Sequence, residues 1–157
     1  MKTLKISSES FEDGGNIPEE FTCDGEDKSP PLSIRNVPSD ADSLALIVDD
    51  PDAPGGIFDH WLIWNLPADI EKIPEGVSRK RTLSSLDGAV QGTNDFGEVG
   101  YRGPCPPSGP SHRYMFKLFA LSSSLDLDPG AKKSELQDAI KDKILKECQI
   151  VGKYKRR

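Results

Sequence analysis

The sequence lacks the features that would place a protein in a membrane or on nucleic acid. It has no run of about 18 apolar residues, and no apolar stretch near its N-terminus resembles a signal peptide. Its formal net charge is −6, so it carries no excess of positive charge for phosphate backbones or anionic lipids. We therefore expect a soluble, cytoplasmic protein that binds no nucleic acid and has no integral membrane association.

Cysteine is also scarce. The 157 residues include three cysteines and no CxxC pair, and an odd number of cysteines gives no complete disulfide framework. Because thiols stay reduced in the cytoplasm, we expect Cys23, Cys105 and Cys148 to be free thiols. We also expect no cofactor and no bound metal.

The sequence has only two histidines, and both occupy the same kind of position. His60 and His112 each stand where a loop rich in glycine and proline meets an apolar, strand-like run. This shared setting predicts one site that contains both imidazoles together with Asp50 and Asp52 of the first loop. A carboxylate beside a histidine favours the imidazolium, so we expect histidine pKa values above the usual ~6.5. Imidazolium groups and the backbone N–H groups of a glycine loop would suit a phosphate or another oxyanion.

The same residues allow other interpretations. Asp52 could form an ion pair with Arg113 instead of contacting a ligand. Two histidines and two aspartates could bind a metal, although the HxH and HExxH spacings are absent. Cys105 or Ser111 beside His112 could act as a nucleophile, although neither lies in a GxSxG elbow.

The loop before His112 is the most unusual stretch of the chain. Residues 92–114 contain five glycines and four prolines, which exclude a helix or a central strand. Phe96, Tyr101 and Tyr114 within it are large groups that favour burial, and an apolar run over 114–121 follows. We therefore predict an ordered functional loop that leads into a buried strand; the alternative is a long surface loop without chemistry.

Elsewhere the pattern predicts short strands and one late helix. Alternating or apolar runs indicate strands near residues 4–7, 32–34, 43–48, 60–66, 86–91 and 113–121. Ser134 as N-cap and Gln137 as its capping-box partner begin a stretch of helical apolar spacing. They predict a helix over 135–148, with Gly152 ending the segment. We expect a single domain over residues 1–157, a mostly β sandwich with a C-terminal helix packed at its edge.

Several motifs, taken in order, resemble the phosphatidylethanolamine-binding protein family, also called Raf kinase inhibitor-like proteins. These motifs are Asp50-Pro51-Asp52-Ala53-Pro54, His60-Trp61, Gly103-Pro104-Cys105-Pro106-Pro107 and His112-Arg113-Tyr114. Three further stretches resemble its bacterial and archaeal branch: Thr22-Cys23-Asp24-Gly25, Ser29-Pro30-Pro31-Leu32 and Gly92-Thr93-Asn94-Asp95-Phe96-Gly97. The resemblance spans residues 21–154 and implies a fold of two antiparallel sheets.

The resemblance also implies a site and a role. In the family a small anion-binding pocket is formed at the positions of Asp50, His60, Gly103, Pro104, His112 and Tyr114; the residue pattern adds Asp52. Members bind phosphate-like groups and, in eukaryotes, act on kinases or as signalling switches. We expect a non-enzymatic, regulatory protein that binds a phosphorylated small molecule or a phosphate-like anion. The alternatives are a small hydrolase using the same pocket and an inhibitor of a protease or kinase. A kinase, a protease and a second copy in a homodimer are the candidate protein partners.

Overall fold

Antiparallel strands dominate the structure. The computed structural model describes residues 3–156, which form nine strands, one α-helix and two short 3-10 helices. The elements in chain order are β1 (Lys5–Ser7), η1 (Glu19–Phe21), β2 (Leu32–Arg35), β3 (Ser43–Asp50), β4 (Phe58–Pro67), β5 (Lys72–Ile73), β6 (Thr82–Leu83), η2 (Ser84–Leu86), β7 (Ala89–Gln91), β8 (His112–Leu121), α1 (Lys133–Ile140) and β9 (Ile144–Tyr154).

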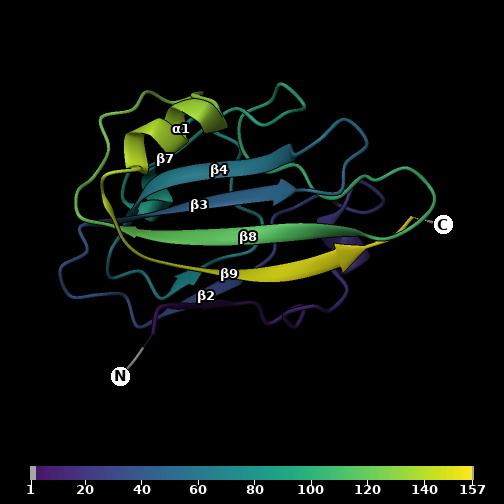
Figure 1. The fold of residues 1–157 in the computed structure, drawn as a ribbon, viewed down its shortest axis with the longest axis horizontal. Helices are drawn as coiled ribbons and strands as arrows, with labels where there is room; N and C mark the ends of the chain where they lie inside the picture. The colour runs from purple at the N-terminus through teal and green to yellow at the C-terminus, as the bar shows by residue number, and fades with distance from the viewer. Residues whose placement is uncertain (1–2, 157) are drawn as a thin grey trace.

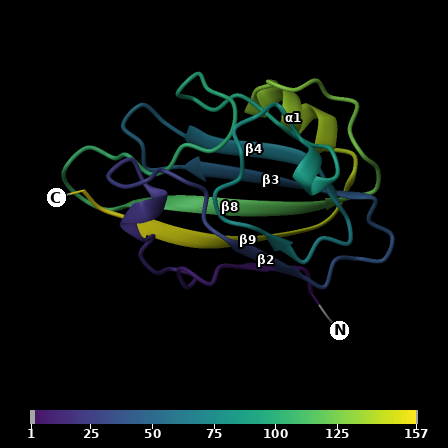
Figure 2. The same cartoon turned by 180° about the vertical axis from the view of Figure 1, so that it is seen from behind.

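The strands form two antiparallel sheets, which confirms the expected fold class. The small sheet has the order β1-β2-β5, and the large sheet has the order β6-β7-β4-β3-β8-β9. In Figure 1 α1 lies in front of the large sheet, and in the reverse view of Figure 2 it lies behind. The small sheet covers the opposite face, so the central strands β3 and β4 are buried on both sides, whereas β9 is largely exposed.

The central strands β3 and β4 are apolar on both faces because each face has its own core. Leu46 and Val48 point into the core between the two sheets, whereas Ile47 between them points into the core beneath α1. On β4, Trp61 belongs to the first core and Leu62 to the second. The alternation expected along residues 60–66 is therefore confirmed only as far as Trp64. Leu66 packs into the first core, because the strand has a bulge at Asn65, whose backbone is left-handed with φ of 56°.

The predicted helix over 135–148 is correct only in its first part. The helix ends at Ile140, and the chain then turns and forms the 11-residue strand β9. Leu136 and Ile140 are buried at helical spacing, but Ile144 is exposed. The remainder becomes a strand because β8 offers a free edge, along which β9 pairs from Ile144 to Tyr154. That long ladder outweighs the local helical spacing.

The start of the helix also differs from the prediction. The N-cap is Lys132, not Ser134, and the Glu135 carboxylate accepts the Lys132 N–H at 3.1 Å. The helix therefore begins one residue earlier than Ser134, and Gln137 has no capping role. The helix has 8 residues, and none of the helices within residues 3–156 combines the length and apolar character of a membrane crossing.

Candidate functional site

Three neighbouring strands of the large sheet bring the predicted site residues to one end of the molecule. Asp50 is the last residue of β3, His60 lies at the start of β4, and His112 and Tyr114 begin β8. Because β4, β3 and β8 are adjacent and antiparallel, the end of β3 lies beside the beginnings of the other two. The side chains surround a cavity of about 190 Å³. Its lining residues are Asp50, Ala53, Pro54, Phe58, His60, Phe96, Cys105, Pro106, Pro107, His112 and Tyr114.

Asp50 orients His112. The Asp50 Oδ2 atom lies 2.7 Å from His112 Nδ1, and Asp50 Oδ1 accepts the Asp52 N–H at 2.8 Å. Asp50 is 3% exposed and His112 is 8% exposed, so this pair is largely shielded from water. Because a carboxylate only accepts, Nδ1 of His112 carries a proton. Both Asp50 oxygens are then occupied, while Nε2 of His112 has no hydrogen-bond partner within residues 3–156.

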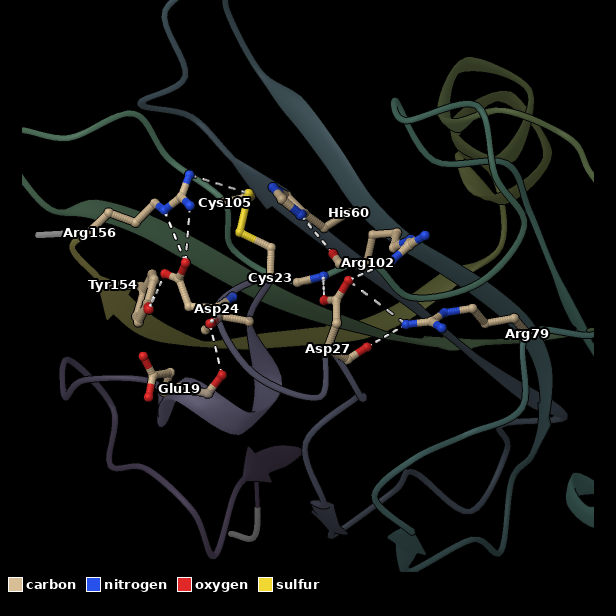
Figure 3. Close-up of a disulfide and its surroundings, with 12 residues drawn as sticks. Glu19, Cys23, Asp24, Asp27, His60, Arg79, Arg102, Cys105, Tyr154 and Arg156 are labelled. Carbon is tan, nitrogen blue, oxygen red and sulfur yellow. Dashed lines mark hydrogen bonds and ion pairs between the residues drawn. A yellow bond between two sulfur atoms is a disulfide. The ribbon is translucent and has the colours of Figure 1, made fainter.

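His60 is held in a similar way by the backbone. Its Nδ1 lies 2.7 Å from the carbonyl oxygen of Arg102, which can only accept, so Nδ1 carries the proton. Figure 3 shows the imidazole turned toward this carbonyl. Nε2 has no partner among the residues that the structure describes. Burial lowers the pKa of His60 below 6.5, and the Arg102 carbonyl and the Asp50 charge only partly oppose this. The expectation of a raised pKa is therefore wrong for His60, because Asp50 bonds to His112 instead.

Tyr114 supplies the third polar group of the pocket. The residue is 1% exposed, and its hydroxyl has no hydrogen-bond partner in the described part of the chain. Burial raises the pKa of Tyr114, and the negative charge of the nearby Asp50 raises it further. The hydroxyl therefore stays protonated and can donate to a ligand. The ring meets the His60 imidazole edge-on, with centroids 5.2 Å apart, so the two groups fix each other's position.

Aromatic and proline side chains form the walls of the cavity. The rings of Phe58 and Phe96 lie 4.8 Å apart, and both contact His60, at 5.2 and 5.5 Å between centroids. Pro106 and Pro107 of the glycine- and proline-rich loop also line the cavity. Sequence analysis missed Phe58 as a lining residue, although its position two residues before His60 on the same strand places both on one face.

Three predicted site residues lie outside the lining. Asp52 forms an ion pair with Arg113, with oxygens 2.9 and 3.0 Å from the guanidinium, and also accepts the Arg113 N–H. The side-chain hydrogen bond from Arg113 lowers the pKa of Asp52 to about 2. Gly103 donates its N–H to Asp27, and Pro104 accepts the N–H of Cys23. These three residues support the loop, and the ligand-binding role given to the full set stays a prediction.

A disulfide forms part of the pocket wall. Cys23 and Cys105 are bonded (Figure 3), with Cα atoms 5.4 Å apart. Cys105 also lines the cavity. The expectation of three free thiols is therefore wrong for this pair, and Cys105 is not available as a nucleophile. The turn after η1 brings Cys23 to the loop, where its N–H also reaches Pro104. Cys148 is a free thiol, as expected, and burial raises its pKa to about 11.

A cluster of ion pairs lies next to the pocket residues, on the side of the large sheet that faces α1. Lys133 Nζ lies 2.6 Å from Asp59 and 3.5 Å from Asp49, and Lys117 Nζ lies 3.1 Å from Asp49. Asp49 and Asp59 face each other across β3 and β4, next to Asp50 and His60. Burial raises the pKa of Asp59, although Lys133 opposes this. Sequence analysis missed the cluster, since only the register of the two strands reveals it.

Among the described residues, other hollows on the surface do not bring several unpartnered polar atoms together. In the one lined by Asp27, Ser29 and Tyr101, these buried groups already have hydrogen-bond partners. The one between α1, β8 and β9 measures about 420 Å³, but Gln137, Glu147 and Gln149 on its walls are exposed to water. Within residues 3–156, no three His, Cys, Asp or Glu side chains are grouped in a way that could hold a metal ion. The smaller cavity at Asp50, His60, His112 and Tyr114 is therefore the better candidate for a binding site.

The chain is similar to known proteins along almost its whole length. Residues 7–155 match the family model described as Phosphatidylethanolamine-binding protein. The UPF0098 protein of Methanothermobacter thermautotrophicus is 50% identical over 153 residues, which cover 98% of this chain and 99% of the relative. The UPF0098 protein of Aquifex aeolicus is 44% identical over 155 residues, covering 98% of this chain and 86% of the relative.

Two crystal structures share the whole fold. A phosphatidylethanolamine-binding protein homolog from Chlamydia trachomatis superposes with a TM-score of 0.91 at 36% identity, covering 100% of both chains. YbcL of E. coli, a member of the same family, gives a TM-score of 0.91 at 30% identity, covering 99% of this chain and 100% of its own. The family match, the relatives and the shared fold lead to one conclusion: the chain belongs to the phosphatidylethanolamine-binding protein family.

Proposed function

We propose that the chain is a non-enzymatic binding protein whose pocket takes the phosphate group of a phosphorylated ligand. One observation carries this proposal. Three polar atoms without a partner in residues 3–156, the Nε2 atoms of His60 and His112 and the Tyr114 hydroxyl, belong to side chains that line one small cavity. Buried polar groups are normally hydrogen-bonded, so the buried Tyr114 hydroxyl without a partner, beside two imidazole nitrogens that also have none, favours a polar ligand.

The pattern of donors and acceptors suits a phosphate group that keeps one proton. Near neutral pH His60 is uncharged, since burial lowers its pKa, and its Nε2 presents a lone pair. The Tyr114 hydroxyl is a donor. An anion in the pocket favours the imidazolium form of His112, whose positive charge then lies beside Asp50. A monoprotonated phosphate offers one P–OH to His60 and accepts from Tyr114 and His112.

The lining residues support binding without turnover. Cys105 is in a disulfide, and both oxygens of Asp50 are already occupied. The described lining contains no serine, threonine or free cysteine. A phosphorylated ligand would therefore meet hydrogen-bonding groups and apolar walls but no activated nucleophile.

Calorimetric titration with O-phosphoserine and with sulfate tests the proposal. Sulfate has the same tetrahedral shape as the phosphate group but carries no proton. One of its oxygens would therefore face the lone pair on Nε2 of His60. An unsatisfied buried acceptor costs about 1–3 kcal/mol, so we expect phosphoserine to bind about 5- to 150-fold more tightly. Phosphate monoesters lose their last proton near about pH 6, so affinity should fall as pH rises above that value. Equal affinity for both anions would contradict the proposed pattern.

A pair of tyrosine variants isolates the pocket. Tyr114→Phe removes the donor, and we expect about a 10- to 150-fold loss of affinity, the range for a hydrogen bond to a charged group. Tyr154→Phe is the matched control, because that hydroxyl bonds to Asp24 outside the cavity. Wild-type protein is also assayed with p-nitrophenyl phosphate and p-nitrophenyl acetate. Hydrolysis that disappears in Tyr114→Phe would favour the hydrolase over a binding protein.

A further inference from the structure

Asp27 does not line the pocket, but it holds the loop that carries Gly103. It sits in the turn before β2, is 9% exposed, and has a left-handed backbone with φ of 59°. Its Oδ1 accepts the Gly103 N–H at 2.7 Å, and its Oδ2 accepts Arg102 Nη1 at 2.8 Å. Its own carbonyl accepts a hydrogen bond from Arg79 (Figure 3).

The peptide unit that Asp27 holds is the one that sets the protonation of His60. This unit joins Arg102 to Gly103: its N–H bonds to Asp27, and its carbonyl accepts from His60 Nδ1 at 2.7 Å. The Arg102 N–H in turn donates to the His60 carbonyl at 3.1 Å. A rotation of this peptide unit would remove the acceptor and let the imidazole proton move to Nε2, which faces the ligand.

The hydrogen bond between Asp27 and the Gly103 N–H requires glycine at position 103. A Cβ on Gly103 would overlap the carbonyl oxygen of Phe21 and lie 2.8 Å from Asp27 Oδ1. Glycine therefore allows the carboxylate to approach the backbone from behind. The two ends of one peptide unit are thus bonded to Asp27 on one side and to His60 on the other.

We propose that Asp27 is a positioning residue: by holding the Arg102–Gly103 peptide it keeps His60 in the Nδ1–H form, with the Nε2 lone pair turned toward the ligand. The consequence for phosphate affinity rests on the function proposed above. The effect on the His60 tautomer does not, so the two can be tested apart.

Nitrogen NMR of the imidazole rings gives the direct readout, because an unprotonated ring nitrogen resonates far downfield of a protonated one. Wild-type His60 should show one tautomer, with the proton on Nδ1. In Asp27→Asn an NH2 donor replaces one of the two oxygens that accept from Gly103 and Arg102, so we expect a mixture of tautomers and about a tenfold weaker affinity for O-phosphoserine. Asparagine tolerates the left-handed backbone, and Asp27→Gly, which tolerates it equally, is the second variant if the first does not fold.

Glu98→Gln is the matched control. Glu98 bonds to the same guanidinium, at 2.9 and 3.0 Å, but does not touch the Gly103 peptide. We expect this variant to keep the wild-type tautomer and affinity. A single Nδ1–H tautomer in the folded Asp27 variants, or an equal mixture in Glu98→Gln, overturns the inference. If the tautomer shifts but wild-type protein binds no phosphate, Asp27 positions His60 as proposed and the binding function is what fails.

Discussion

Replacing Cys23 and Cys105 together by serine should lower the free energy of unfolding by about 4.5 kcal/mol. The disulfide joins residues 82 positions apart, so it closes a large loop in the unfolded chain. In the chain-entropy model, a loop of this length removes about 15 cal/mol/K from the unfolded ensemble, which gives about 4.5 kcal/mol at 25 °C. Domains of this size are typically stable by about 5–15 kcal/mol, so the loss would be a large part of the total.

The folded state should keep its shape without the bond. The Cys23 N–H still reaches the Pro104 carbonyl, and Asp27 still holds Gly103. We therefore expect the change to act mainly on the unfolded state, which predicts a lower urea midpoint together with a native-like spectrum. Wild-type protein reduced with a dithiol should behave like the double variant.

Equilibrium unfolding in urea, with and without reductant, measures the difference. Cys148→Ser is the control, because that thiol is free and the substitution should act equally under both conditions. A difference below about 1 kcal/mol between oxidised wild type and the double variant would refute the loop-closure estimate. Alkylation of the unreduced, denatured protein followed by mass measurement shows independently whether the bond is present.

Three further outcomes are expected. NMR titration should find a pKa of about 2 for the Asp52 carboxyl. Its ion pair with Arg113 therefore stabilises the folded protein above about pH 4, and this stabilisation is lost as the pH falls through the pKa of Asp52 in the folded state. Arg113→Ala should return that pKa toward 3.8, and an unchanged pKa would contradict the assignment. Lys133→Met should lower the free energy of unfolding by about 3 kcal/mol, because it removes a positive charge from the buried carboxylates of Asp49 and Asp59. An unchanged free energy of unfolding in urea would contradict this. Gly103→Ala should lower the free energy of unfolding by about 2 kcal/mol, because the added Cβ meets the Phe21 carbonyl oxygen. A variant as stable as the wild type would argue against such tight packing.

The candidate site could be found in the sequence because its residues lie at strand ends. Both histidines follow loops rich in glycine and proline, and adjacent antiparallel strands bring such ends together. The partner of each histidine could not be found in this way. Asp50 bonds to His112 across the β3–β8 pair, so burial and not a carboxylate determines the pKa of His60.

The remaining errors have one physical origin, which is contact between distant segments. Residues 141–148 carry spacing that suits a helix. Residues 141–143 form a turn instead, and the free edge of β8 makes 144–148 part of β9. The number of cysteines does not reveal that the turn after η1 meets the loop at Cys105. Asp27 lies 76 residues from the peptide that it holds, so no local pattern indicates its role.

The end of β9 determines how this protein should be attached to a sensor surface. Tyr154 and Arg156 both bond to Asp24, and Arg156 lies 3.8 Å from the sulfur of Cys105 in the pocket wall. Figures 1 and 2 show the first coloured residues, in purple, and the last, in yellow, near opposite ends of the long axis. An affinity tag attached at this end of the chain would compete for these contacts beside the pocket wall. Immobilisation through the segment before β1 would leave these contacts undisturbed.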